Sequence, residues 1–185
     1  DRPPESIAAD SVVWDDRTGG ALAAGHLVER GHRRIAFVGD YAWLPTTIER
    51  LAGIGDVLDP AGIAWRDLVR TGAHEAAGAG DRVEELLALP DPPTAIVAGN
   101  NRIMLGVAAR MSATPLASRP ALVGFDDFEW SEVLGATVVT GDAEEMGCEA
   151  ARLALARMSD RDRPVDVRVL PMRLIPRGSG ERGPV

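Results

Sequence analysis

The sequence contains no lysine, because every one of its 20 basic residues is an arginine. This absence excludes Schiff-base catalysis, a lysine general base and the lysine of a phosphate-binding loop. The one cysteine, Cys148, cannot form an internal disulfide. The three histidines, His26, His32 and His74, lack the spacing of a metal-binding motif. We therefore expect neither a bound metal nor a cofactor.

Long hydrophobic runs are also missing. No apolar stretch reaches the roughly 18 residues that cross a bilayer, and the start of the sequence lacks the layout of a signal peptide. We therefore expect a soluble, cytoplasmic protein without membrane contacts. The 28 acidic residues outnumber the basic ones and give a formal net charge of -8. Such a surface repels DNA, so this chain alone is predicted to bind nucleic acid poorly.

Short apolar runs, typical of buried strands, alternate along the chain with longer segments of helical periodicity. The predicted strands are 34–39, 94–99 and 121–125, with weaker candidates at 67–71, 137–140 and 167–175. The predicted helices are 16–30, the segments that begin after Asn100 and after Asp142, and, with weaker patterns, 46–59 and 79–89. This alternation predicts an α/β fold, in which a parallel sheet carries helices on both faces.

The helix that begins after Asp142 carries an apolar stripe. Cys148, Ala151, Leu155 and Met158 recur on it at helical spacing. We expect this stripe to lie in the core, so that Cys148 is a packing residue rather than a nucleophile. The final segment, 178–185, is rich in glycine and charge and is predicted to be a disordered tail.

Polar residues follow several of the predicted strands. In open parallel sheets, ligands bind at the carboxyl ends of strands. The residues at these positions are Asp40, Tyr41, His74, Asn100, Asn101, Asp126 and Asp127, with Trp43, Thr46 and Arg50 following in the Asp40 loop and its helix. Carboxylates, an amide, an arginine and aromatic rings suit a polyol or a similar polar small molecule. Helix capping explains Asp or Asn at any single position equally well, and the coincidence at several strand ends favours a ligand site.

An enzyme would need more than these residues. Asp126 and Asp127 are neighbours and point in different directions, so they do not flank a bond as the carboxylates of a glycosidase do. Ser131 lacks the surroundings of a nucleophile elbow, and no glycine-rich nucleotide motif follows a strand. We therefore predict that the chain is not an enzyme.

Four motifs occur along the chain, "HLVERGHRRIAFVGD" (26–40), "RLAG" (50–53), "NNRIMLG" (100–106) and "LVGFDD" (122–127), and two weaker ones follow, "TVVTGDAEEMG" (137–147) and "VLPMRLIPRGS" (169–179). In this order and spacing they resemble the effector-binding core of LacI/GalR-type transcription regulators, which is itself similar to periplasmic sugar-binding proteins.

The resemblance implies roles for individual residues. It places the sugar-contacting arginine at Arg50, the asparagine at Asn100 and the cleft aspartate at Asp126. Asp1 matches an aspartate of the family, His74 lies where relatives often stack an aromatic on the ligand, and Thr46 lies near a polar contact. Tyr41 and Trp43 complete the predicted effector-binding set. Asp127 is expected to be a structural neighbour that caps or bonds loop amides.

The resemblance also implies an organisation. A first lobe would be represented only by 1–12 and 142–166, and is therefore incomplete. A second, effector-binding lobe would span 13–141 and 167–177 and be essentially complete. The family binds operator DNA through an N-terminal helix-turn-helix that this sequence does not contain, and it forms homodimers. The acidic residue usual after the cap asparagine is replaced here by Asn101, and "VLGA" replaces a proline-rich lead into "TVVT".

These observations predict the ligand-sensing portion of a transcription regulator, more often a repressor than an activator, that binds a sugar-like effector between two lobes. The alternatives are a solute-binding receptor for sugar transport and, less favoured, an enzyme of the same layered fold.

Overall fold

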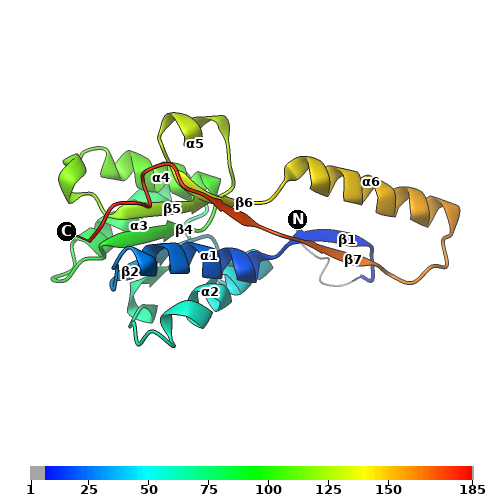
Figure 1. The fold of residues 1–185 in the computed structure, drawn as a ribbon, viewed down its shortest axis with the longest axis horizontal. Coiled ribbons are helices and arrows are strands. Elements are labelled where there is room, and N and C mark those ends of the chain that lie inside the picture. The colour runs from blue at the N-terminus through cyan, green and yellow to red at the C-terminus, as the bar shows by residue number, and fades with distance from the viewer. Residues whose placement is uncertain (1–6, 185) are drawn as a thin grey trace.

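The computed structural model describes residues 7–184 and shows an α/β fold built around one large sheet (Figure 1). This sheet has six strands in the order β3-β2-β4-β5-β6-β8. Neighbouring strands run parallel, except that β8 is antiparallel to β6. The strands are β2 (Ile35–Val38), β3 (Val69–Arg70), β4 (Ala95–Ala98), β5 (Ala121–Phe125), β6 (Thr137–Thr140) and β8 (Arg173–Ile175).

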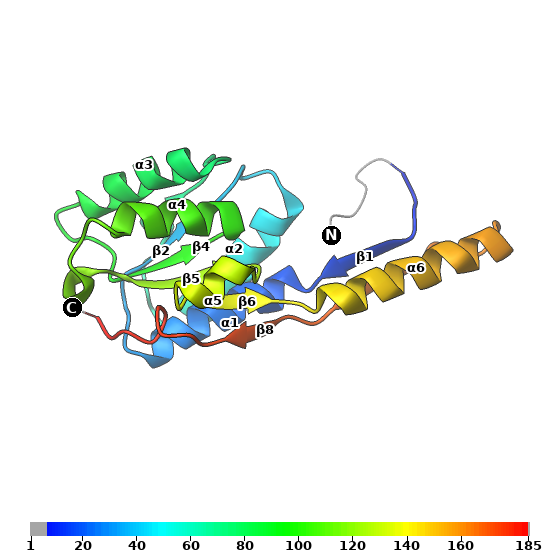
Figure 2. The ribbon, with the colours of Figure 1, turned by 90° about the horizontal axis from the view of Figure 1, so that it is seen from above.

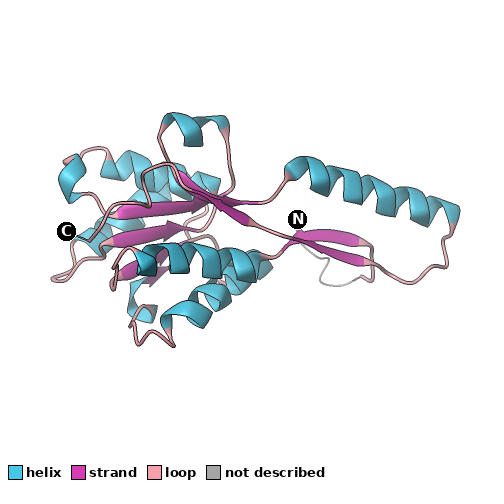
Figure 3. Ribbon diagram, in the orientation of Figure 1, coloured by secondary structure: helices cyan, strands magenta, loops and turns pink. Residues whose placement is uncertain are grey.

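Helices cover both faces of this sheet, as the predicted fold class requires (Figure 3). The helices of the larger body are α1 (Asp16–Glu29), α2 (Pro45–Leu58), α3 (Ala76–Leu87), α4 (Asn101–Met111) and the short α5 (Glu129–Val133). Alternate strand residues face opposite sides: Phe37 and Val97 pack with α1 and α2, whereas Val38 and Ile96 pack with α3 and α4. Because both faces are covered, β2, β4 and β5 are buried along their whole length.

A smaller unit extends from this body (Figures 1 and 2). It consists of β1 (Ser11–Trp14), which pairs in parallel with β7 (Val167–Leu170), and of the helix α6 (Ala143–Ser159). Its buried apolar cluster is small, formed by Val12, Leu153 and Leu170. The division into two lobes stays a prediction; the strand pairing groups 13–14 and 167–170 with the smaller unit rather than with the larger body.

The predicted strands and helices are largely confirmed. β5 and β6 have the predicted bounds, whereas 67–71 contributes only β3 after a turn of 3-10 helix at Arg66–Leu68. The segment 167–175 divides into β7 and β8, which belong to different sheets. Pro171 lies at the division and has no N–H for a strand ladder.

The prediction that Cys148 and its stripe lie in the core is wrong. Cys148 is exposed, and the side chains of Leu155 and Met158 are 63% and 76% exposed. The residue of α6 that is buried is Leu153, on another side of the helix. The stripe was read from periodicity, which shows that a face is apolar but not that anything covers it.

The prediction of a disordered tail at 178–185 is wrong for residues 178–184. The Ser179 hydroxyl is buried, donates to the Leu122 carbonyl at 2.6 Å and accepts the Thr137 N–H at 2.8 Å. Glu181 pairs with His26 at 2.6 Å. The segment therefore packs along the sheet edge, and its glycines permit a close approach: a Cβ atom on Gly180 would lie 2.9 Å from Val123.

Candidate functional site

A polar pocket of about 240 Å³ lies at the carboxyl ends of β2, β4 and β5. Its lining comes from the loops that follow these strands and β3, from the first two turns of α2 and from the start of α4. The lining residues are Asp40, Thr46, Thr47, Arg50, His74, Gly99, Asn100, Asn101, Arg102 and Asp126. Several of the polar residues that follow the strands therefore lie together at one edge of the sheet.

Arg50 forms the floor of this pocket. It is buried on α2, and its Nε and Nη2 atoms each lie 2.6 Å from one carboxylate oxygen of Asp16. Its Nη1 atom donates to the Gly99 carbonyl at 2.5 Å, and its guanidinium lies 4.1 Å from the centroid of the Phe125 ring. A guanidinium carries five N–H donors, so a ligand can still receive one from each terminal nitrogen.

Asp16 was not predicted as part of the site. It follows the N-cap Asp15 at the start of α1 and is buried against Arg50. Burial raises the pKa of Asp16, the Arg50 guanidinium opposes this rise, and the charge of Asp126 adds to it. The consecutive acids at 15 and 16 were the available signal, but only the fold reveals that the second reaches Arg50.

Asp126 has an unusual backbone. Its φ is +70°, and it is the one non-glycine residue with positive φ among those described. This left-handed conformation is costly for a residue with a Cβ atom, and such residues concentrate at functional sites. Its N–H donates to the Val139 carbonyl at 3.0 Å, which holds the turn directly after β5.

Asp127 faces elsewhere, as expected for a structural neighbour. Its two carboxylate oxygens accept from the two terminal nitrogens of Arg177, each at 2.7 Å. The partner is a guanidinium, not the loop amides that were predicted. The side chain of Asp127 does not line the pocket.

Asn100 combines both roles that its position allowed. Its side-chain oxygen accepts the Ile103 N–H at 2.9 Å and so caps α4. The capping bond leaves the two N–H donors of the same amide available, and Asn100 lines the pocket. Capping therefore orients the amide for a ligand rather than competing with one.

The aromatic residues form a stack at one side of the pocket. His74 lines the pocket, and its Nδ1 atom lies 3.2 Å from both carboxylate oxygens of the buried Asp40. The Tyr41 ring stacks on His74 and on Trp43, with centroid separations of 5.5 and 5.8 Å. Tyr41 and Trp43 themselves do not line the pocket.

The structure thus brings five predicted effector contacts into one pocket and adds residues that prediction missed. The five are Arg50, Asn100, Asp126, His74 and Thr46, and their roles in binding stay predictions. Asp1 lies outside the described residues. Thr47 and Arg102 were not predicted, although each adjoins a residue that was noted.

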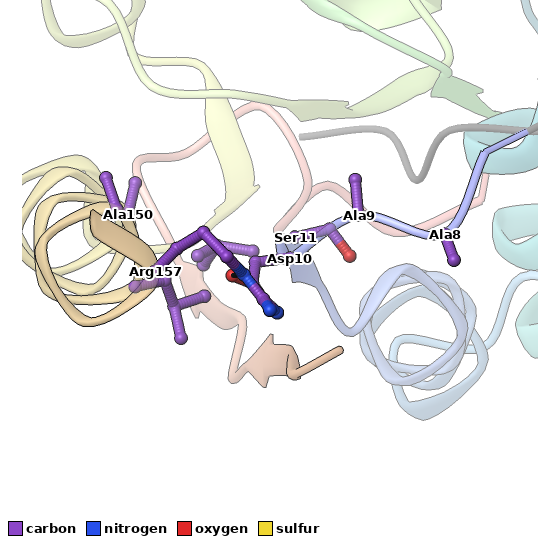
Figure 4. A pocket seen from close by; sticks show the side chains of 9 residues that line it. Ala8, Ala9, Asp10, Ser11, Ala150 and Arg157 are labelled. Carbon is purple, nitrogen blue, oxygen red and sulfur yellow. Dashed lines mark hydrogen bonds and ion pairs between the residues drawn. The ribbon is translucent and has the colours of Figure 1, made fainter. Parts of the chain in front are cut away.

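A larger hollow of about 530 Å³ lies in the smaller unit, between β1 and α6 (Figure 4). Alanines line much of it, and its charged residues already satisfy each other: Arg157 donates to both carboxylate oxygens of Asp10, at 3.0 and 2.9 Å. The hydrogen bonds from Arg157 and, to a lesser degree, from the Asp166 N–H lower the pKa of Asp10 to about 2. Ligand sites need polar groups that converge and remain available, so size does not make this hollow the better candidate.

Comparison with known proteins identifies the family. A family model described as a periplasmic binding protein-like domain matches residues 24–180. The crystal structure of a LacI transcriptional regulator from a Rhodococcus species is 31% identical and superimposes with a TM-score of 0.83, covering 97% of this chain and 71% of that one. The chain belongs to the LacI family.

Other members of the LacI family agree with this assignment. The HTH-type transcriptional regulator GalR of Escherichia coli (strain K12) is 31% identical over 173 residues, which are 91% of this chain and 50% of GalR. A structure described as a transcriptional regulator CelR-cellobiose complex is 29% identical with a TM-score of 0.86, covering 97% of this chain and 57% of that one. The chain therefore carries the effector-binding core of the family and spans about half the length of GalR.

These LacI-family relatives are transcription regulators, so the comparisons favour neither a transport receptor nor an enzyme. Within residues 7–184, no helix is long and apolar enough to cross a membrane. The same residues contain no group of three or more potential metal ligands.

Proposed function

We propose that this chain is the ligand-sensing portion of a LacI-family repressor. It binds a sugar or a similar polar small molecule, and this binding allosterically controls the affinity of the repressor for operator DNA. The observation that carries the proposal is the pocket at the ends of β2, β4 and β5, where carboxylate, amide, hydroxyl and guanidinium groups converge. Carboxylate oxygens accept from sugar hydroxyls, and the free N–H groups of Asn100 and Arg50 donate to them. A family relative in complex with cellobiose supports this ligand class.

Control of DNA binding requires that the effector bind two arrangements of the protein with different affinity. A coupling of about 1 to 3 kcal/mol changes operator affinity roughly 5- to 150-fold. DNA contact itself would come from a helix-turn-helix outside this sequence, because this chain carries a net charge of -8. A cytoplasmic location is part of the same proposal.

The test uses the complete regulator and fluorescence anisotropy of labelled operator DNA, with and without sugars. We expect Asp126→Asn to bind operator normally and to lose the response to sugar, because the pocket loses an acceptor for ligand hydroxyls. Asp81→Asn is the matched control, since Asp81 is an exposed aspartate of α3 that does not line the pocket. A normal sugar response in Asp126→Asn would remove the support for this site.

Self-association is a separate part of the proposal. Around α5, the apolar side chains of Val133, Leu134 and Phe128 are 85%, 53% and 41% exposed. Exposed apolar side chains gathered on one element are typical of a protein interface. We propose that this patch contributes to a homodimer, and sedimentation of Val133→Glu, which places a charge at its most exposed position, tests it. An unchanged dimer mass would exclude the patch.

A further inference from the structure

The acidic groups of the pocket exceed its available positive charge. Among the described residues, no cation pairs with the carboxylate of Asp126. The carboxylate of Asp40 accepts the Tyr41 N–H at 2.7 Å and contacts His74. Both acids therefore face the pocket without an arginine partner.

The two arginines of the pocket already have acid partners. Arg50 is paired with Asp16, and the Nη2 atom of Arg102 lies 3.0 Å from the carboxylate of Glu75. An anionic ligand would thus meet the unpaired carboxylate of Asp126, the carboxylate of Asp40 beside His74, and two guanidiniums that already have acid partners. A phosphate or carboxylate group that bound there would lose its hydration and would gain no ion pair in compensation.

The part of the pocket that this chain forms is also small. Its volume of about 240 Å³ lies below the roughly 300–1,000 Å³ of complete ligand sites. One sugar ring fills a space of this size, so any further part of a ligand must extend past these lining residues.

The aromatic stack beside the pocket offers a surface for a part of the ligand that extends past the lining residues. The rings of His74, Tyr41 and Trp43 are nearly parallel, with interplanar angles of 15° and 10°. Their centroid separations of 5.5 and 5.8 Å indicate offset stacking, which leaves part of each ring face uncovered. Tyr41 is 41% and Trp43 65% exposed, so an apolar platform rises from the pocket wall into solvent.

We infer that the ligand is a neutral glycoside of more than one ring, with one ring among Asp40, Asn100 and Asp126 and the next against the Tyr41 and Trp43 rings. This inference rests on the proposed sugar-binding function and narrows it. The charge of the pocket disfavours phosphorylated sugars, and free monosaccharides leave the platform uncovered.

The test is a titration of the complete, ¹⁵N-labelled regulator, followed by NMR at the Trp43 indole N–H and at the amides of Asn100 and Asp126. The probes form two matched series: methyl β-glucoside, cellobiose and glucose 6-phosphate, and methyl β-galactoside, lactose and galactose 6-phosphate. In at least one series, we expect the disaccharide to bind about 3- to 10-fold more tightly than the methyl glycoside, a gain typical of one aromatic contact. The phosphate ester should bind at least about 10-fold more weakly than the methyl glycoside.

Variants test whether the tighter binding of the disaccharide comes from the Tyr41 and Trp43 rings. Trp43→Ala should remove the advantage of the disaccharide and leave methyl glycoside binding unchanged, whereas Trp43→Phe should retain part of it. Leu116→Ala is the matched control, because Leu116 is a large apolar residue that is 62% exposed, close to the 65% of Trp43, and that does not line the pocket.

Three results would overturn the inference. If the disaccharide binds no more tightly than its methyl glycoside, or if its advantage survives Trp43→Ala, the Tyr41 and Trp43 rings do not bind a second sugar ring. The proposed function is not affected by this result. A phosphate ester that binds as tightly as the neutral glycoside overturns the charge argument alone. If no probe shifts the Asn100 and Asp126 amides, sugar binding by this pocket fails together with the inference.

Discussion

Arg50 and Asp16 join two helices at the floor of the pocket: the Nε and Nη2 atoms of the arginine on α2 both lie 2.6 Å from one carboxylate oxygen at the start of α1. The same guanidinium binds the carbonyl of Gly99 after β4 and covers the ring of Phe125 on β5. One side chain thus fixes four elements relative to one another. A residue assigned to the ligand by resemblance is therefore also a structural residue.

We predict that Arg50→Ala destabilises the chain by about 3 to 5 kcal/mol, because it leaves the Asp16 carboxylate buried without its partner. Urea unfolding followed by circular dichroism measures the change. Arg66→Ala is the control: Arg66 makes a comparable pair with Asp59 at 2.6 Å, but the two side chains are 69% and 44% exposed. An exposed pair is worth at most about 1 kcal/mol. Equal losses in the two variants would contradict a structural role for Arg50.

The close contact between α1 and α2 depends on glycine. A Cβ atom on Gly53 would lie 1.8 Å from the Arg17 carbonyl oxygen, so Gly53→Ala must push the two helices apart. We expect a loss of about 1 to 3 kcal/mol or more, the usual cost of overpacking. Gly25→Ala, in the same pair of helices, meets nothing within 4 Å and should stabilise by about 0.5 to 1 kcal/mol through helix propensity. The thermal unfolding temperatures of the two variants measure this difference. If Gly53→Ala were more stable than the wild type, α1 and α2 would not approach each other so closely.

The sequence predicted the central strands of the larger sheet well, because β2, β4 and β5 are buried on both faces. A run such as 121–125 must then be apolar throughout, and the caps at Asn100 and Asp142 mark helices by local hydrogen bonds. Convergence of the strand-end residues followed from the rule for parallel sheets.

What the sequence could not predict depends on contacts between distant residues. Asp16 and Arg50 are 34 positions apart, and no local pattern pairs them. The glycine content of the segment after Arg177 predicts disorder, yet the order of this segment comes from contacts with Thr137 and Leu122. Periodicity predicts a buried stripe through Leu155, but the exposure of this stripe depends on whether another element covers it.

Stability should fall as the pH is lowered through the range in which His32 titrates. His32 is fully buried, and burial lowers its pKa below the usual 6.5, with the charge of Arg30 adding to the effect and the Arg182 carbonyl opposing it. Below about pH 6.5 the unfolded chain therefore binds a proton that the folded chain does not, and the folded state loses stability until the pH reaches the folded pKa.

Urea midpoints between pH 8 and pH 5 measure this dependence. His32→Gln should be less stable at pH 8, because it alters the bonds to Thr94 and Arg182, and should show a smaller decrease between pH 7 and pH 5. His74→Gln is the control, since the His74 side chain is 52% exposed. Identical pH dependence in the wild type and in His32→Gln would assign the loss to other groups.

The packed C-terminal segment predicts an effect of truncation that a disordered tail would not have. A chain that ends at Arg177 loses the Ser179 hydroxyl, which satisfies buried groups of Leu122 and Thr137, and the Glu181 carboxylate, which accepts from the Thr137 hydroxyl at 2.7 Å and pairs with His26. Each lost hydrogen bond contributes about 0.5 to 1.5 kcal/mol, and buried groups left unsatisfied cost more. We therefore expect a loss of about 2 to 5 kcal/mol on removal of residues 178–185.

A shorter truncation provides the matched control, because removal of 184–185 keeps Ser179, Glu181 and the Arg182 peptide carbonyl in place. It should change the urea midpoint little, since Pro184 is exposed. Ser179→Ala isolates the central contact and should account for about 1 to 3 kcal/mol of the loss, the cost of unsatisfied buried partners. If both truncations left the midpoint unchanged, the segment would not contribute to the stability of the sheet edge. If Ser179→Ala alone were neutral, the contribution would lie with Glu181 and its contacts to His26 and Thr137.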